Sequence, residues 1–185
     1  MPETITHHYV DTDYLLPYLF YGNRELKSLL AKDKRVEKEK RETLKKCFFS
    51  RNTNIFYKIP LIVIGEVYNK FKSNIDFFTS TAAITHMNDE INKLCNRYNV
   101  DFVPPNNECF RTAWKLSDIS NRDYLGPTDA LIVSQALYDK NSKKIYTQDR
   151  AIINSLINGL VCKSNKDLYE NGSRLALLGV DKSHL

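Results

Sequence analysis

The sequence is poor in cysteine, and its few cysteines are not spaced as a metal site. No Cys-x-x-Cys pair occurs, and no histidine lies near a cysteine at the spacing of metal ligands. This pattern argues against a structural zinc site. We interpret the four cysteines as buried free thiols: Cys47, Cys95, Cys109 and Cys162.

Long apolar runs are also missing. The longest, from Ile59 to Gly65, is far shorter than the roughly 20 residues that a transmembrane helix needs. The residues before the first predicted strand show neither the basic stretch nor the apolar core of a secretory leader. We therefore expect a cytoplasmic protein without membrane contact.

The composition is that of a folded protein with a substantial core. Hydrophobic residues make up 42% and aromatic residues 11% of the 185 positions, which suits one domain of ordinary size. We find no internal repeat or low-complexity tract, and we expect one domain over residues 1–185.

The net charge of +5 is concentrated in one segment. Residues 24–46 hold ten Lys and Arg against five Asp and Glu, which leaves 17 of each sign in the rest of the chain. Such a segment is typical of a surface that binds a polyanion. It equally fits a solvated helix with ion pairs four residues apart, such as Glu37 with Arg41 and Glu42 with Lys46. Both interpretations stay open.

Five basic side chains are candidates for binding phosphate groups. Arg122 and Arg150 are predicted to lie in loops near the edge of the sheet where ligands bind. The other three belong to the basic segment: Lys38, Arg41 and Lys45.

The spacing of apolar residues predicts alternating strands and helices. Strands are predicted over residues 7–10, 54–59, 100–103, 144–147 and 160–163. Helices are predicted over residues 14–20, 23–47, 60–71, 77–98, 107–117, 128–138 and 151–156. This alternation favours an α/β sandwich with a mainly parallel sheet. Trp114 lies on the apolar side of its predicted helix, so we expect it to pack in the core.

Four acidic residues are expected to meet at one edge of this sheet. Asp11 and Asp149 each follow a predicted strand, and ligands bind beyond the carboxyl ends of parallel strands. Asp129 falls in the first turn of a helix, where the helix dipole favours an anion. Glu66 lies among apolar residues within a helix, where an unpaired carboxylate is costly.

Converging carboxylates repel one another, and divalent cations compensate that repulsion. Oxygen ligands without nearby histidine or cysteine favour Mg²⁺ or Mn²⁺ over zinc. Such ions activate water and stabilise a departing oxygen in phosphoryl transfer, so no nucleophilic side chain is required. We therefore predict a metal-dependent nuclease with Asp11, Glu66, Asp129 and Asp149 as catalytic metal ligands.

The residues around these acids resemble the PIN-domain nucleases, especially the VapC-like ribonucleases of toxin–antitoxin modules. The resemblance lies in four segments that occur in the same order: YVDTDYLL at residues 9–16, PLIVIGEV at 60–67, TDALIV at 128–133 and YTQD at 146–149. These segments span residues 9–149, so the resemblance extends over most of the chain.

The resemblance implies a Rossmann-like three-layer α/β/α sandwich with a mainly parallel central sheet. It also implies Mg²⁺ or Mn²⁺ at the four carboxylates, RNA as the substrate, a homodimer, and an antitoxin protein as a partner. Because the family's Thr-x-Asp motif supports the site through its threonine, Thr147 is expected to play that part.

Two features depart from the family pattern. Asp13 stands where many relatives carry Ser, Thr or Asn, so it is a fifth candidate metal ligand. The chain is also longer than most toxin-type relatives. The extra length is expected in a basic helical insertion at about residues 24–47 and in the helix over 77–98.

Two alternatives stay open. The Asp11-Thr12-Asp13 turn also resembles haloacid-dehalogenase-type phosphatases, in which the first Asp is a nucleophile. A non-catalytic RNA-binding PIN module is the second alternative. Individually, Asp11, Asp129 and Asp149 also have a purely structural explanation at helix starts.

Overall fold

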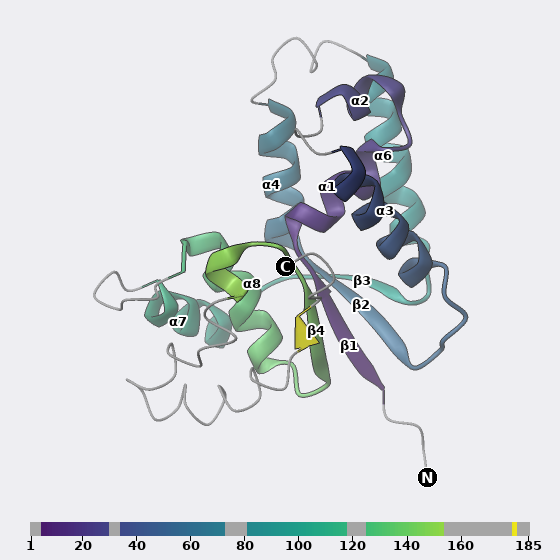
Figure 1. Cartoon of the computed structure of the whole chain (residues 1–185). Coiled ribbons are helices and arrows are strands. Elements are labelled where there is room, and N and C mark those ends of the chain that lie inside the picture. The colour runs from purple at the N-terminus through teal and green to yellow at the C-terminus, as the bar shows by residue number, and fades with distance from the viewer. Residues whose placement is uncertain (1–4, 30–33, 73–80, 118–124, 154–178, 181–185) are drawn as a thin grey trace.

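The computed structural model describes residues 5–29, 34–72, 81–117, 125–153 and 179–180 (Figure 1). Its five strands are β1 (Thr6–Val10), β2 (Ile55–Pro60), β3 (Val100–Val103), β4 (Ser142–Tyr146) and β5 (Gly179–Val180). Its labelled helices are α1 (Thr12–Phe20), α2 (Arg24–Leu29), α3 (Lys34–Phe48), α4 (Leu61–Lys72), α6 (Thr81–Cys95), α7 (Asn107–Leu116) and α8 (Pro127–Tyr138). The α/β class predicted from the sequence is confirmed.

The five strands form one sheet in the order β3-β2-β1-β4-β5, and all neighbouring strands pair in parallel. In this register, Val10 lies beside Tyr146 and Pro60 beside Val103. The carboxyl ends of β1, β2, β3 and β4 therefore meet along one edge. The segments that follow these strands begin at that edge.

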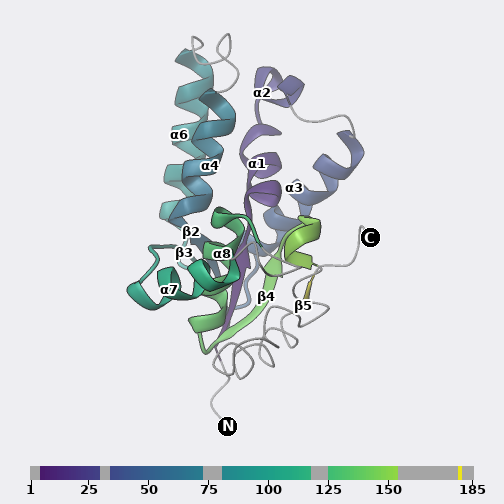
Figure 2. The same ribbon diagram turned by 90° about the vertical axis from the view of Figure 1, so that its left-hand side faces the viewer.

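Helices cover both faces of the sheet, an arrangement compatible with three α/β/α layers. Neighbouring residues of a strand point to opposite faces, so Tyr9 and Val10 contribute to different cores. One core joins Val10 and the β2 residues Tyr57 and Ile59 to α1, α3, α4 and α6. The other joins Tyr9 to α7 and α8. Figure 1 shows α4 and α6 extending beyond the carboxyl ends of the strands, and Figure 2 shows α7 and α8 in front of the sheet.

Several predicted boundaries differ from the structure. The helix predicted over 23–47 is described as α2 and α3, with residues 30–33 outside the described part. Pro60 is the last residue of β2 rather than part of the helix that follows. The strand predicted over residues 160–163 lies outside the described residues, and β5 was not predicted.

The ion pairs within α3 also differ from the predicted ones. Glu37 bonds to Lys40 at 3.1 Å, and Arg41 bonds to Glu42 at 2.8 Å. The predicted partners, Arg41 for Glu37 and Lys46 for Glu42, are therefore wrong, although Arg35 and Glu39 do form a pair at four-residue spacing, at 4.0 Å. Burial explains the first change, because Lys40 turns inward beside Glu37.

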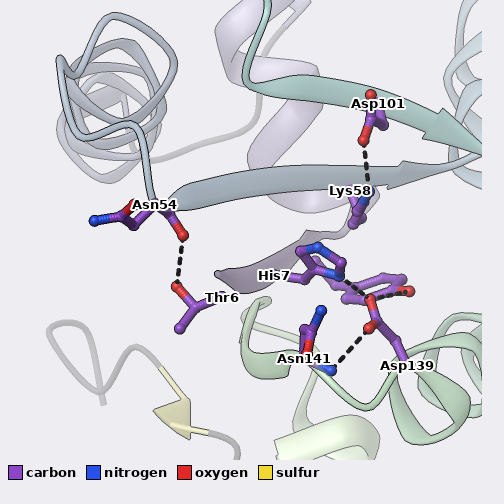
Figure 3. A network of polar contacts seen from close by, with 8 residues as sticks. Thr6, His7, Asn54, Lys58, Asp101, Asp139 and Asn141 are labelled. Carbon is purple, nitrogen blue, oxygen red and sulfur yellow. Dashed lines mark hydrogen bonds and ion pairs between the residues drawn. The ribbon is translucent and has the colours of Figure 1, made fainter. Parts of the chain in front are cut away.

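A polar network fastens the end of α8 and its neighbouring turn to β1 (Figure 3). His7 Nδ1 lies 2.6 Å from Asp139 Oδ2, and the Tyr9 hydroxyl donates to the same oxygen at 3.1 Å. The amide of Asn141 donates to the other oxygen of Asp139 at 3.0 Å. Asp139 directly follows α8, so this network fixes that helix against the sheet.

None of the described helices combines the length and the apolar composition needed to cross a membrane.

Candidate active site at the carboxyl ends of the strands

Asp11 is a buried carboxylate at the junction between β1 and α1, with only 4% of its surface exposed. Its Oδ1 accepts a 2.5 Å hydrogen bond from the Thr12 amide, as the N-cap of α1. Its Oδ2 accepts a 2.6 Å hydrogen bond from the Thr147 hydroxyl. Asp11 thus caps α1 and also lies at the carboxyl end of β1, where a ligand-binding residue was expected.

Thr147 connects the ends of β1 and β4. Its side chain is fully buried, and its Oγ1 also accepts a hydrogen bond from the Asp149 amide at 3.0 Å. The structure therefore brings Thr147 into direct contact with Asp11, where a supporting residue is expected.

Glu66 reaches the same junction from α4. Its Oε2 accepts a hydrogen bond from the Thr12 hydroxyl. Thr12 therefore bonds through its amide to Asp11 and through its side chain to Glu66. The sequence indicated Thr12 only as part of the Asp-Thr-Asp turn, and its bond to Glu66 was not predicted.

Asp13 faces the loop after β4. Its Oδ2 accepts a 2.8 Å hydrogen bond from the Gln148 amide. Its Oδ1 is shielded from solvent and has no hydrogen-bond partner in the described structure. A buried carboxylate oxygen left without a donor suits a cation.

Asp149 lies at the end of the same loop and caps the helix that begins at Arg150. Its Oδ1 accepts hydrogen bonds from the amides of Ala151 at 2.7 Å and Ile152 at 3.2 Å. The structural explanation for Asp149 is thus correct. It is compatible with a second role, because a carboxylate has further acceptor sites.

Asp129 lies in the first turn of α8 and is half-buried. Its pKa is raised to about 6, chiefly by burial and then by the negative charges of Asp149, Glu66 and Asp13. Those three carboxylates belong to three other parts of the chain. Because charge effects of this kind require proximity, the acids predicted from separate motifs act on one another.

The pKa values of Asp11 and Asp13 are also raised by burial and by neighbouring carboxylates. Burial raises the pKa of Asp11 well above its ordinary range, the charges of Asp13 and Asp129 add to this, and the bonds from Thr147 and Thr12 oppose it. The pKa of Asp13 is raised to about 6, chiefly by burial, while the positive charge of Lys40 and the Gln148 amide lower it. All three carboxyls are destabilised in their charged form.

In the described residues, no group of three or more His, Cys, Asp or Glu side chains is arranged to hold a metal ion. Several carboxylate oxygens instead accept hydrogen bonds from hydroxyl and amide groups. The donor set nevertheless fits Mg²⁺ or Mn²⁺ chemically, because it is all oxygen, is mutually repulsive, and includes the unpartnered Oδ1 of Asp13.

The basic residues predicted to bind RNA do not share one environment. Lys38, Lys45 and Arg150 are exposed, whereas Arg41 is half-buried and bonded to Glu42. Arg122 lies outside the described residues. Lys40 is buried, which was not predicted. Lys40 precedes the buried Leu44 by four residues and the buried Phe48 by eight, which places all three on one side of the helix. This spacing could have predicted its burial.

Two expectations about apolar residues are wrong. Trp114 is 84% exposed rather than part of the core, and Cys95 is exposed rather than buried. The face of α7 that packs inward carries Cys109, Ala113 and Leu116 instead. The expected burial of Cys109 is confirmed, Cys47 is half-buried, and Cys162 lies outside the described residues.

Comparison with known proteins adds no family assignment. No protein-family model matches the chain, and no curated protein matches it.

Proposed function

We propose that this chain is a metal-dependent ribonuclease of the PIN type. The observation that carries the proposal is the junction at the strand ends, where Thr12 bonds to both Asp11 and Glu66 and Thr147 bonds to Asp11. The raised pKa of Asp129, to which the charges of nearby acids contribute, supports it. Paired or grouped carboxylates with raised pKa values are typical of functional sites. The four acids stand in the order and sequence context of PIN-domain nucleases.

The residues that would hold Mg²⁺ or Mn²⁺ are Asp11, Asp13, Glu66, Asp129 and Asp149. When bound there, the ion would supply a Lewis acid that activates water and offsets negative charge on the phosphate. The chain itself orients the carboxylates. Thr12 and Thr147 fix the two oxygens of Asp11, and Thr12 also directs Glu66.

RNA as the substrate is supported by the same sequence context and by the exposed lysines of α3. A cytoplasmic location, a homodimer and an antitoxin partner belong to the proposal as well. They follow from the resemblance to VapC-like ribonucleases and from the composition.

The test is cleavage of a fluorescently labelled single-stranded RNA of mixed sequence by the purified protein. We expect cleavage with Mg²⁺ or Mn²⁺ and none in excess EDTA. Asp129→Asn should lower the rate at least roughly hundredfold, because it removes a negatively charged metal ligand. Glu108→Gln removes an exposed acid from α7 and is the matched control. Cleavage that persists in EDTA contradicts the proposal.

The same preparation distinguishes the two alternatives. A phosphatase that uses Asp11 as a nucleophile forms an acid-stable aspartyl-phosphate, which mass spectrometry detects. A non-catalytic module binds the RNA and leaves it intact under every metal condition.

A further inference from the structure

Helix α7 leaves its two aromatic side chains in solvent. Trp114 is 84% exposed and Phe110 is 52% exposed. Side chains four residues apart are neighbours on a helix, so the two rings form one aromatic stripe on the surface. The buried side of α7 consists of other residues, namely Cys109, Thr112, Ala113 and Leu116. Because that side already packs against α8, the stripe is not needed to hold the helix in place.

A basic stripe lies beside the aromatic one. Arg111 follows Phe110 and Lys115 follows Trp114, so an aromatic–basic pair occurs twice, about one helical turn apart. Both basic residues are exposed. Arg111 bonds to Glu108 at 3.1 Å, but both side chains are more than half exposed, and an ion pair in solvent is weak. A phosphate group therefore competes readily for the Arg111 guanidinium.

The size and charge of this surface favour a nucleic acid over a protein partner. Stable protein interfaces bury roughly 800 Å² on each side, whereas two aromatic side chains bury only about 150 to 250 Å² each. The stripe alone is thus too small to hold a second copy of the chain. Single-stranded RNA is bound differently, because aromatic rings stack on its bases and cations contact its phosphates. The stripes of α7 supply both kinds of group.

The carboxyl-terminal end of α7 is joined to the start of α8. The carbonyl of Leu116, the last residue of α7, accepts a 3.0 Å hydrogen bond from the Leu125 amide. Leu125 precedes Gly126, the N-cap of α8, and Asp129 lies in the first turn of that helix. Trp114 therefore belongs to the end of α7 that is bonded to the segment leading to Asp129.

We propose that Phe110 and Trp114 form a stacking platform for the bases of single-stranded RNA, with Arg111 and Lys115 as contacts for its phosphates. The platform holds a strand whose next nucleotides reach the acid cluster. Every base has an aromatic face, so this surface supplies affinity without a base preference. The inference rests on the proposed function, since RNA is the proposed substrate.

The first test uses the fluorescence of Trp114, the only tryptophan of the chain. A short oligoadenylate is titrated into the protein in EDTA, so that no RNA is cut. We expect saturable quenching of the Trp114 emission, because a stacked base covers the indole. A duplex RNA keeps its bases stacked inside the helix and should bind without this quenching. Single-stranded RNA that binds and leaves the emission unchanged would overturn the proposal.

The second test separates stacking from charge by measuring RNA affinity at several salt concentrations. Trp114→Ala should bind oligoadenylate roughly tenfold more weakly, with the same slope of log affinity against log salt, because the ring carries no charge. Trp114→Tyr keeps an aromatic ring and should retain most of the affinity. Arg111→Gln combined with Lys115→Gln should instead reduce the slope by about 1.4, or about 0.7 for each lost phosphate contact.

The matched control is Tyr98→Ala. Tyr98 is also an exposed aromatic residue, but it precedes β3 and so lies at the opposite edge of the sheet from the acids. Its removal should leave RNA affinity unchanged. Equal losses in Trp114→Ala and Tyr98→Ala, or no loss in Trp114→Ala, contradict the platform. A blue shift of the Trp114 emission with rising protein concentration, without RNA, means that a second copy covers the stripe, and this result also overturns the proposal.

The platform and the proposed function fail separately in these assays. A wild type that binds RNA with quenching of Trp114 but never cuts it contradicts the ribonuclease and supports the platform. A wild type that cuts RNA with Mg²⁺, and whose KM is unchanged by Trp114→Ala, contradicts the platform and leaves the ribonuclease intact.

Discussion

The Thr147 hydroxyl donates a 2.6 Å hydrogen bond to the Asp11 carboxylate across 136 positions of sequence. The bond joins the segments that follow two neighbouring parallel strands, and both side chains are buried. A buried carboxylate that loses a donor is costly, because water does not replace the missing bond. Thr147 therefore couples the stability of the fold to the geometry of the candidate site.

The variant Thr147→Val tests this coupling. Valine keeps the shape of threonine and removes the donor, so we expect a loss of about 1.5 to 3 kcal/mol in the free energy of unfolding, as for a hydrogen bond to a charged group. RNA cleavage should also fall. Thr147→Ser retains the hydroxyl and should keep most of the stability and most of the cleavage rate. Equal losses in the two variants would show that the methyl group matters rather than the bond.

Asp129→Asn should stabilise the metal-free protein at neutral pH. The pKa of Asp129 in the folded protein is raised to about 6, above its value of about 4 in the unfolded chain. The folded state thus binds more protons in this window, and its stability falls as the pH rises from about 4 to about 6. Asparagine removes this loss, which we expect to be roughly 1 kcal/mol after solvent screening.

Urea unfolding at pH 4 and pH 7 measures this effect. The two proteins should be alike at pH 4 and differ at pH 7. Mg²⁺ should then stabilise the wild type more than the variant, because only the wild type keeps the full acid set. A variant that is less stable at pH 7 contradicts the account.

His8 should influence stability in the opposite direction over the same pH range. Burial lowers its pKa to about 4, with help from the positive charges of Lys144 and His7. The unfolded chain therefore binds more protons between about pH 4 and 6.5, and stability is lost as the pH falls through this window. Because His8 packs edge-on against Tyr57, His8→Phe keeps an aromatic ring there and removes the titration.

We expect His8→Phe to lose less stability than the wild type on acidification, by roughly 1 to 2 kcal/mol after screening. Thermal unfolding at pH 4.5 and pH 7 is the measurement. Each variant is compared with the wild type at both values, so the opposing effect of the raised carboxyls cancels. If His8→Phe leaves the pH dependence of stability unchanged, the pKa of His8 is not lowered in the folded state.

The strands and the acids that follow them could be predicted for a physical reason. Parallel strands buried on both faces give short apolar runs, and their carboxyl ends share an edge, so Asp11 and Asp149 are placed by topology alone. Strand β5 has only two residues, Gly179 and Val180, and so few positions show no periodicity.

The errors at Trp114 and Lys40 have a different cause. Helix α7 has apolar residues on two sides, and spacing does not tell which side faces the core. Packing against α8 buries Ala113 and Leu116 and leaves Trp114 outside. Lys40 shares its side of α3 with Leu44, but composition alone made α3 look solvated throughout. Tertiary contacts decide both cases.

The exposure of Trp114 is directly measurable, because it is the only tryptophan in the chain. We expect the fluorescence of a hydrated indole, with strong quenching by acrylamide and little change in emission wavelength on unfolding. Trp114→Ser should change the free energy of unfolding by less than about 0.5 kcal/mol. Leu116→Ala, on the buried side of the same helix, should cost about 2 to 4 kcal/mol. A marked red shift on unfolding would contradict the exposed position.

The exposed lysines of α3 should contribute to RNA affinity through charge alone. We expect Lys38→Gln with Lys45→Gln to weaken binding of single-stranded RNA, measured by fluorescence anisotropy in EDTA so that no cleavage occurs. Each lost phosphate contact reduces the slope of log affinity against log salt by about 0.7, so the double variant should lose about 1.4. Lys93→Gln, at an exposed lysine on α6, is the matched control and should leave the slope unchanged. If the slope of the double variant also stays the same, α3 is a solvated helix that makes no phosphate contacts through these lysines.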